Sequence, residues 1–282
     1  MRRSRALVLS ATVVCVSLFS AGAAQAQFPG DVPDTFRVQA GGMYSWFTTE
    51  LTFEENQSGS VGAAIDLDNV FDLPARAGFY GRAAFNLGFL SFDAAYVGFS
   101  RTRTATISRD ITFGDTTYTA GASVEAKQTT QLPYADIRIN FFHNPSFQLG
   151  VTAGVAYPIL KADLTAAAGV VGPGGPIVGT TVTKQAKIET PVPLLGIVVE
   201  TAFTPRFSGG IVFNGIFAAF HPYSGSIFQA DAHLDYYFSR NFGVGGGFNY
   251  TRFRIKKDDL PNVLIDFHHD FYGPRAYLTL TF

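Results

Sequence analysis

The stretch AYLTLTF, residues 276–282, ends the chain with an unbroken alternation of side chains. Because successive side chains of a strand point to opposite faces, four apolar ones share one face: Ala276, Leu278, Leu280 and Phe282. In a soluble fold the last residues usually fray and are polar. We therefore expect this strand to pair with the first strand and to close a cylinder whose outer face contacts lipid.

The first residues have the pattern of an export signal. Three arginines among the first five residues precede a mainly apolar run, and Ala24-Gln25-Ala26 is a small-residue cleavage pattern. These are the marks of a secretory signal peptide. We expect residues 1–26 to be the signal peptide and residues 27–35 to form a short periplasmic segment. A membrane anchor is the less favoured interpretation, because serine and threonine interrupt the run.

Charge and cysteine content exclude several classes of function. Removal of the signal leaves 21 − 3 = 18 basic and 22 acidic residues, so a nucleic-acid partner is not expected. The single cysteine, Cys15, lies in the signal, which excludes disulfides, cysteine catalysis and cysteine-bound zinc from the mature chain. No cofactor is expected. After the signal there is no apolar run of about 20 residues, so a membrane-spanning fold must be a closed barrel.

Short turns flanked by phenylalanine indicate the hairpins of such a barrel. They lie at residues 85–89, 142–147, 203–207 and 238–242. A second aromatic residue of the same parity recurs eight to ten residues away: Phe36 to Trp46, Phe147 to Tyr157, Phe207 to Phe217, Phe238 to Phe228, Phe242 to Tyr250 and Phe282 to Tyr272. Ten residues of a tilted strand span roughly 25 Å, the height of the apolar band of an outer-membrane barrel. A soluble β-sandwich would have no reason to repeat this interval.

Four short turns and two chain ends on the periplasmic side predict ten antiparallel strands. The expected strands cover residues 36–50, 76–87, 89–107, 119–142, 147–164, 187–203, 207–220, 226–238, 242–256 and 265–282. The expected outer loops are residues 51–75, 108–118, 165–186, 221–225 and 257–264. Eight or twelve strands are the alternatives, if a long loop hides a hairpin or the first strand is only partly formed.

These features together resemble small outer-membrane β-barrel proteins of bacteria. The closing strand resembles their C-terminal insertion signal, and the resemblance covers residues 36–282, although Pro274 stands where a bulky outward residue is usual. It implies an all-β, closed antiparallel transmembrane β-barrel. It also implies outer-membrane lipid, lipopolysaccharide and the barrel insertion machinery as partners, the last through the strand that ends at Phe282. The motifs that carry the resemblance imply no activity.

Charged side chains in the expected strands share the parity that faces the lumen. They are Arg76, Arg82, Asp93, Asp136, Arg138, Glu200, Asp231, His233, Asp235 and Arg275. On the lipid face an arginine near the midplane would cost about 2–4 kcal/mol. Gly243, Gly245 and Gly247 leave room on the same inner face. A ring of about ten strands is nearly filled by its own side chains, so we favour an interior closed by ion pairs. A narrow path for ions or small polar solutes is the alternative.

Four prolines fall at similar heights on three consecutive expected strands: Pro133, Pro158, Pro191 and Pro193. Proline donates no ladder hydrogen bond, so these positions weaken strand pairing on one side of the barrel. One hypothesis is a lateral gap through which an apolar molecule leaves the lumen for the membrane. The favoured alternative is that the strands leave the membrane there, since irregularities are common at barrel rims.

Outer loop 51–75 combines a polar first part with apolar residues that could fold over the mouth as a lid: Ile65, Leu67, Val70, Phe71 and Leu73. A second feature at this end is His268-His269-Asp270, near the charged loop at 256–259. Adjacent histidines point to opposite faces of a strand, so at most one could join Asp270 on a metal. We interpret this cluster as solvated loop charge.

Asp231 and His233 lie two residues apart on one face, as in the Asp–His pair of omptin proteases, which are ten-stranded barrels. A second carboxylate pair exists at Asp66 and Asp68. That pair lies in the first outer loop, whereas Asp231 and His233 lie five to seven residues from a periplasmic turn. We therefore expect no catalysis. No Gly-x-Ser-x-Gly element indicates a serine hydrolase either.

The sequence thus predicts an integral protein of the cell outer membrane, reached after signal-directed export. Its expected role is non-catalytic: structural, surface-interacting or a narrow channel. The alternative is a carrier for small apolar compounds through the lateral gap, and a more remote one is an omptin-like protease.

Overall fold

The computed structural model describes residues 36–55, 64–144, 146–172, 174–177, 180–259 and 263–282. The expected signal peptide (1–26) and periplasmic segment (27–35) lie outside these ranges. Nearly all described residues belong to antiparallel strands, which confirms the all-β prediction. No helix in the described part of the chain is long and apolar enough to cross a membrane.

The elements follow one another as β1 (Phe36–Glu55), β2 (Ile65–Asp66), α1 (Leu67–Phe71), β3 (Arg76–Leu87), β4 (Leu90–Thr106), β5 (Ile111–Phe113), β6 (Thr116–Tyr118), β7 (Ser123–Asn144), β8 (Phe147–Ala156), β9 (Ile159–Ala166), β10 (Val170–Gly172), β11 (Gly175–Ile177), β12 (Val182–Glu189), β13 (Val192–Thr204), β14 (Phe207–Phe220), β15 (Tyr223–Tyr237), β16 (Phe242–Asp259) and β17 (Val263–Thr281).

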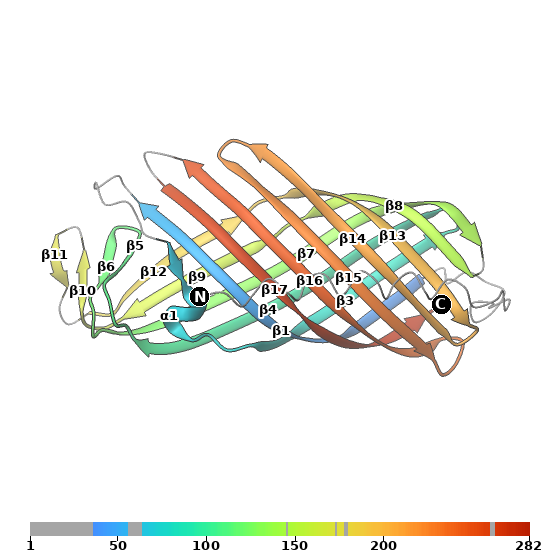
Figure 1. Cartoon of the computed structure of the whole chain (residues 1–282), viewed down its shortest axis with the longest axis horizontal. Coiled ribbons are helices and arrows are strands. Elements are labelled where there is room, and N and C mark those ends of the chain that lie inside the picture. Colours follow the sequence, from blue (N-terminus) through green and yellow to red (C-terminus); the bar gives the residue numbers. More distant parts are fainter. Residues whose placement is uncertain (1–35, 56–63, 145, 173, 178–179, 260–262) are drawn as a thin grey trace, which may run out of the picture.

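The main sheet closes on itself between the first and last long strands. β1 pairs with β17 along almost its whole length, and the strand order continues around the ring from β17 through β16, β15, β14 and β13 to β8, and from β1 through β3 and β4 to β7 (Figure 1). At the seal, the Phe36 and Phe282 backbones exchange two hydrogen bonds, of 3.2 Å and 2.8 Å. This confirms the closed antiparallel barrel and the role predicted for the final residues.

The number of membrane-crossing strands depends on how two interruptions are treated. The main sheet contains thirteen strands in the described residues. β8 and β9 are separated only by residues 157–158, and β12 and β13 only by residues 190–191. Joining each pair and leaving out the two-residue β2 gives ten spans. The expected count of ten stays a prediction, because it requires these choices.

Two levels of aromatic side chains bound the apolar outer surface. At the periplasmic end the rings of Phe36 and Phe282 lie 6.3 Å apart, and at the outer level Trp46 and Tyr272 lie 5.8 Å apart. The exposed large apolar side chains lie between these levels or at the periplasmic turns. In water such a surface would be unfavourable, whereas lipid covers it.

Beyond the outer level, the strands continue and enclose an apolar core. Several inward side chains there are at most 5% exposed: Leu51, Phe53, Leu132, Leu160, Leu164, Ile188, Phe253, Ile255, Phe267 and Phe271. The outer faces of the same strands carry polar residues such as Glu50, Arg252 and His268, which contact water. This end of the molecule is thus built like a soluble β-protein.

Several outer loops are therefore shorter than expected, and their predicted starts at residues 51 and 257 are wrong. β1 continues to Glu55 and β16 to Asp259, and β12 begins at Val182, not at residue 187. The interval of eight to ten residues between the two aromatic levels measures only the part of each strand that crosses the membrane. It does not detect strands that extend into water with their own apolar inner face.

Two of the expected loops fold into a small second sheet above the barrel mouth. Its order is β11-β10-β6-β5, at the end of the molecule opposite the C-terminus (Figure 1). Phe113 is fully buried against Phe53, with ring centroids 4.9 Å apart, and the Tyr118 hydroxyl donates to the Leu164 carbonyl at 2.8 Å. This sheet closes the mouth from one side.

Candidate functional site in the barrel lumen

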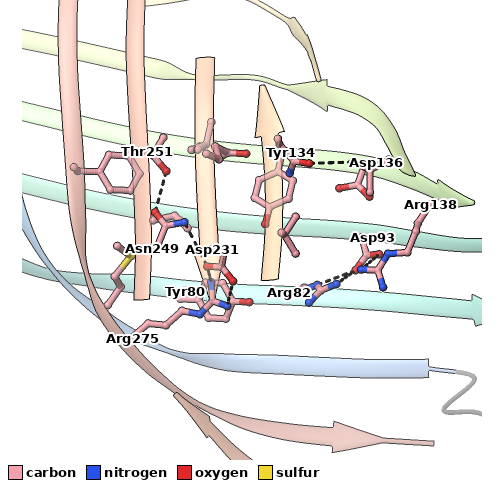
Figure 2. Close-up of a pocket in the computed structure, with 18 residues that line it drawn as sticks. Tyr80, Arg82, Asp93, Tyr134, Asp136, Arg138, Asp231, Asn249, Thr251 and Arg275 are labelled. Atoms are coloured by element: carbon pink, nitrogen blue, oxygen red, sulfur yellow. Dashed lines mark hydrogen bonds and ion pairs between the residues drawn. The ribbon is translucent and has the colours of Figure 1, made fainter. Parts of the chain in front are cut away.

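The lower lumen contains a chain of charged side chains from four strands. Arg82 on β3 donates through Nε to Asp93 on β4 at 2.8 Å. Arg138 on β7 contacts the other oxygen of Asp93 at 3.3 Å and donates to Glu200 on β13 at 2.9 Å. All four share the parity opposite to the lipid-facing residues, and Figure 2 shows Arg82, Asp93 and Arg138 side by side in the lumen. The chain crosses the lumen and alternates in charge.

A second charged group lies beside it, on the closing strand β17 and on the nearby strands β15 and β16. Arg275 on β17 forms a bidentate ion pair with Asp231 on β15, with Nη2 2.7 Å from Oδ1 (Figure 2). The guanidinium also lies 4.5 Å from the ring centre of Tyr80, a cation–π contact. Asn249 donates to Asp231 at 3.4 Å. Planar, bidentate pairing suits arginine, and it fixes the position of both charges.

His233 lies between two aspartates of its own strand. Its Nδ1 is 3.5 Å from Asp231 Oδ1 and its Nε2 is 3.8 Å from Asp235 Oδ2. Asp235 is only 2% exposed. These distances exceed those of good hydrogen bonds. No group of three or more potential metal ligands occurs among the described residues.

The space that remains between the two groups is small. A cavity of about 40 Å³ is lined by Arg82, Asp136, Asp231, Arg275 and neighbouring polar side chains. Since a water needs roughly 10–15 Å³ by this measure, the cavity has room for about three waters. Side chains thus occupy most of the space around this cavity.

Gly245 shows why glycine occupies this part of β16. A Cβ atom at this position would overlap the ring of Tyr277 and the carboxylate of Asp235. The prediction that Gly243, Gly245 and Gly247 leave room for side chains from across the barrel is wrong for Gly245, because Tyr277 and Asp235 belong to the neighbouring strands β17 and β15. The ring and the carboxylate occupy the space that a side chain would need.

Arg76 and Asp136 were also predicted to face the lumen, and neither takes part in the ion pairs described above. Arg76 is exposed at the start of β3, above the level of the network. Asp136 lines the cavity next to Arg82 and Arg138 (Figure 2). Arg37 was missed, although it is 8% exposed on the inner face of β1. Its parity, shared with Met43, was the available signal.

A second buried polar cluster lies higher, within the apolar core, and the sequence did not reveal it. His269 is fully buried, with Nδ1 3.0 Å from Thr49 Oγ1 and Nε2 3.0 Å from Thr130 Oγ1. Gln128 contacts Nδ1 at 3.2 Å. The interpretation of His269 as solvated loop charge is wrong, because alternation turns it inward while its neighbours His268 and Asp270 face outward.

Arg101 joins this cluster to the segment that contains α1. Its guanidinium stacks 4.0 Å from the centre of the Phe47 ring and donates to Thr49 at 3.2 Å. Its Nη1 is 2.6 Å from Asp68 in α1. Burial raises the pKa of the Asp68 carboxyl, and the charge of Arg101 offsets this only in part. An arginine inside the barrel thus holds an outer segment.

The segment predicted as a lid folds back onto the barrel. Ile65, Leu67, Phe71 and Leu73 are between 0% and 8% exposed, and they pack into the apolar core. Asp66 caps α1 by accepting from the Asn69 backbone N–H at 3.0 Å. β2 pairs with β1, so the segment completes the wall beside β1, and a lid over the mouth stays a prediction; residues 56–63 lie outside the described part of the chain.

Pro133, Pro158 and Pro191 coincide with short interruptions in the ladders, whereas Pro193 lies within β13 and pairs with Val155. From β7, the pairing passes from β8 to β9 across two unpaired residues and resumes in the same register. β8 pairs with β13 and β9 pairs with β12, again with two unpaired residues between the ladders and no change of register. Within the first break, the Tyr157 N–H still donates to the Pro133 carbonyl at 2.8 Å. The breaks lie at the height of Tyr157, an outer-girdle residue, and the gap at Pro133, Pro158, Pro191 and Pro193 stays a prediction.

The residues compared with omptins have separate structural partners. Asp66 caps α1 and Asp68 pairs with Arg101, whereas Asp231 pairs with Arg275 in the lower lumen. His233 has Asp231 and Asp235 as its nearest charged neighbours. The Asp66–Asp68 pair and the Asp231–His233 pair therefore belong to different clusters.

Comparison with known proteins adds information on the fold only. No family model and no curated protein sequence matches the chain. Among solved structures, the outer membrane protease OmpT from Escherichia coli is similar at a TM-score of 0.51 and 15% identity, over 87% of this chain and 97% of that one. The translocator domain of autotransporter NalP from Neisseria meningitidis matches at 0.40 and 12%, over 89% and 90%. The toluene transporter TodX of Pseudomonas putida matches at 0.37 and 7%, over 89% and 91%. The chain thus has the fold of outer-membrane β-barrels.

Proposed function

We propose that this protein is an integral outer-membrane barrel with a closed lumen, and that it acts through its outer surface and not as a pore or an enzyme. The observation that carries this proposal is that two different layers of side chains occupy the barrel interior. The lower lumen is occupied by paired charges, and the upper lumen by an apolar core. These two layers support a lumen without a continuous aqueous path.

The outer end supports a surface role. The α1 segment and the β5–β6 hairpin both bury aromatic side chains at this end, so the exposed face is a folded surface of loops and strand ends. A rigid scaffold that presents loops is a common arrangement for binding. Outer-membrane lipid, lipopolysaccharide and the barrel insertion machinery are the partners that we propose for the membrane-embedded part.

The proposed lack of catalysis rests on the structural contacts that the candidate catalytic carboxylates already make. Asp66, Asp68 and Asp231 each have a capping or ion-pairing partner. A water-activating pair would need to share one water within hydrogen-bond reach. Incubation of the refolded protein with unbiased peptide libraries should give no cleavage. Cleavage abolished by both His233→Ala and Asp68→Asn would contradict this part of the proposal.

Solute flux tests the closed lumen. Liposomes that contain the refolded protein should swell in small sugars and amino acids no faster than empty liposomes, whereas liposomes with a general porin swell readily. Heat-dependent mobility on gels checks that the protein is folded in the same liposomes. Swelling that increases with the amount of folded protein would contradict a closed barrel.

A further inference from the structure

The hydrogen-bond ladder between β13 and β14 ends before either strand does. Its last pair toward the outer end is Leu195 with Gly215. Beyond it, β13 still pairs with β8 as far as Val192, and β14 pairs with β15 as far as Phe220. We call the facing stretches 192–194 and 216–220 the seam. Among the described residues no ladder joins its two sides.

A similar discontinuity on the opposite side of the wall is filled. β3 begins only at Arg76, so the outer parts of β1 and β4 have no strand between them there. β2 pairs with β1 in this space, and α1 places Leu67 and Phe71 against the core. No described segment covers the seam in this way. Pro191 and Pro193 lack backbone N–H groups, so this edge also offers fewer donors to a replacement strand.

Behind the seam lies a small apolar pocket that is continuous with the core. Val192, Ala218, Ile227 and Ile255 line it, and three of these belong to the buried core. Its volume of about 10 Å³ holds no more than about one water, so a larger occupant requires the seam to widen. Widening would break no pair of the β13–β14 ladder, because that ladder already ends at Leu195.

The height of the seam identifies what lies outside it. Phe217 on β14 is 73% exposed and Leu195 on β13 is 57% exposed, and both face outward. Phe217 belongs to the outer aromatic level, where acyl chains meet head groups. Ser224 and Ser226, at the rim of the pocket, supply hydroxyl groups at this level. The surroundings are therefore outer-leaflet lipid, with an apolar path inward and hydroxyls at the ester level.

We propose that the seam binds one acyl chain of an outer-leaflet lipid, which inserts between β13 and β14 to reach Val192, Ile227 and Ile255. The carbonyl of the ester accepts a hydrogen bond at the serine rim. The chain end replaces the missing ladder with apolar contacts, which burial of its methylene groups stabilises. This site is independent of the lumen charges and of the closed-barrel proposal.

Photolabelling tests the site in the refolded full-length barrel. The probe is phosphatidylcholine with a diazirine near the end of one acyl chain, in nanodiscs, with adducts mapped by mass spectrometry. Ordinary annular lipid reaches only outward residues such as Phe213 and Phe228. The proposal predicts additional adducts on inward residues Val192, Ile227 or Ile255. Adducts confined to outward residues would overturn it.

Two further comparisons make the result specific. Ala218→Phe fills the pocket from the inner face and should lower the inward adducts by about tenfold, equivalent to about 1.4 kcal/mol. Ala232→Phe, on the outer face of β15 and away from the seam, should leave them unchanged, and Ala218→Leu replaces the first variant if that one does not fold. Equal labelling of the inner-face residues Val97 and Phe99, or labelling at Leu132 alone, would contradict the seam. Labelling by a free photoreactive fatty acid but not by the lipid would contradict the assigned occupant.

Discussion

Arg138 is the residue on which the lower charge chain depends. It contacts both Asp93 and Glu200, which are 5% and 9% exposed. Removing one member of a buried ion pair leaves its partner uncompensated and typically costs about 3–5 kcal/mol. We expect Arg138→Ala to lower the free energy of unfolding by this amount, as measured by urea titration in detergent micelles.

Arg76→Ala is the matched control, because that arginine is exposed at the strand end, and surface changes usually stay within about 0.5 kcal/mol. The double variant Arg138→Met with Glu200→Gln should recover part of the loss. Equal stability of wild type and Arg138→Ala would mean that the ion pairs do not hold the lumen together.

Glycine spacing on β16 gives a second residue-scale prediction. Gly245 faces inward against Tyr277 and Asp235, whereas a Cβ at Gly246 would meet only the Arg275 carbonyl, at 3.6 Å. Overpacking typically costs about 1–3 kcal/mol, so Gly245→Ala should destabilise the barrel by that amount. Gly246→Ala should be nearly neutral in the same urea titration. A larger loss from Gly246→Ala would show that the inner and outer faces of β16 are reversed.

At the scale of elements, the α1 segment depends on one ion pair inside the barrel. Asp68 pairs with Arg101, whose side chain is 2% exposed, whereas Asp72 pairs with Arg103 in solvent at 3.1 Å. We expect Asp68→Asn to loosen this segment and to speed hydrogen exchange at residues 65–73, while Asp72→Asn leaves exchange unchanged. Exposed pairs contribute little, which is why the second variant is a control. Identical exchange in both variants would mean that apolar packing alone holds the segment.

The β5–β6 hairpin is tied to β12 by a different pair. Lys184 Nζ is 2.6 Å from Asp115 Oδ1. Burial raises the pKa of Asp115, but hydrogen bonds from Lys184 and Thr116 outweigh this and hold it below its usual value. A lowered pKa means that the stabilisation is present above the unfolded pKa and is lost as the pH falls through the folded pKa.

An NMR titration of the Asp115 carboxyl in micelles checks this pH dependence. The pKa of Asp115 should lie below the ordinary value of an aspartate, and Lys184→Met should raise it. If Lys184→Met leaves the pKa unchanged, then the lysine does not hold the hairpin.

At the scale of the whole molecule, the sequence predicted those features that depend on local periodicity. Alternation at the C-terminal strand predicted closure onto β1, and the same parity placed Arg82, Asp93 and Arg138 on the inner face. The pairs Arg138–Glu200 and Arg275–Asp231 could not be predicted, because their partners come from strands that are not consecutive in sequence. Register across the ring decides those contacts.

The features that were missed lie where the wall leaves the membrane. Nothing in the local pattern distinguishes His269, fully buried, from His268 beyond the fact that they face opposite ways. The apolar outer core depends on how far each strand extends beyond the membrane, and the local sequence pattern does not give these lengths. The prolines did indicate a weakened wall, but the unpaired stretch lies on the other flank of the same strand, between β13 and β14.

The central claim is that the lumen is closed by paired charges below and an apolar core above. Planar-bilayer recording of the refolded wild-type protein tests it most directly, with insertion verified by recovering folded protein from the membrane. The account predicts a baseline without stable conductance steps across both polarities. Reproducible ohmic steps of uniform size, one for each inserted molecule, would contradict it.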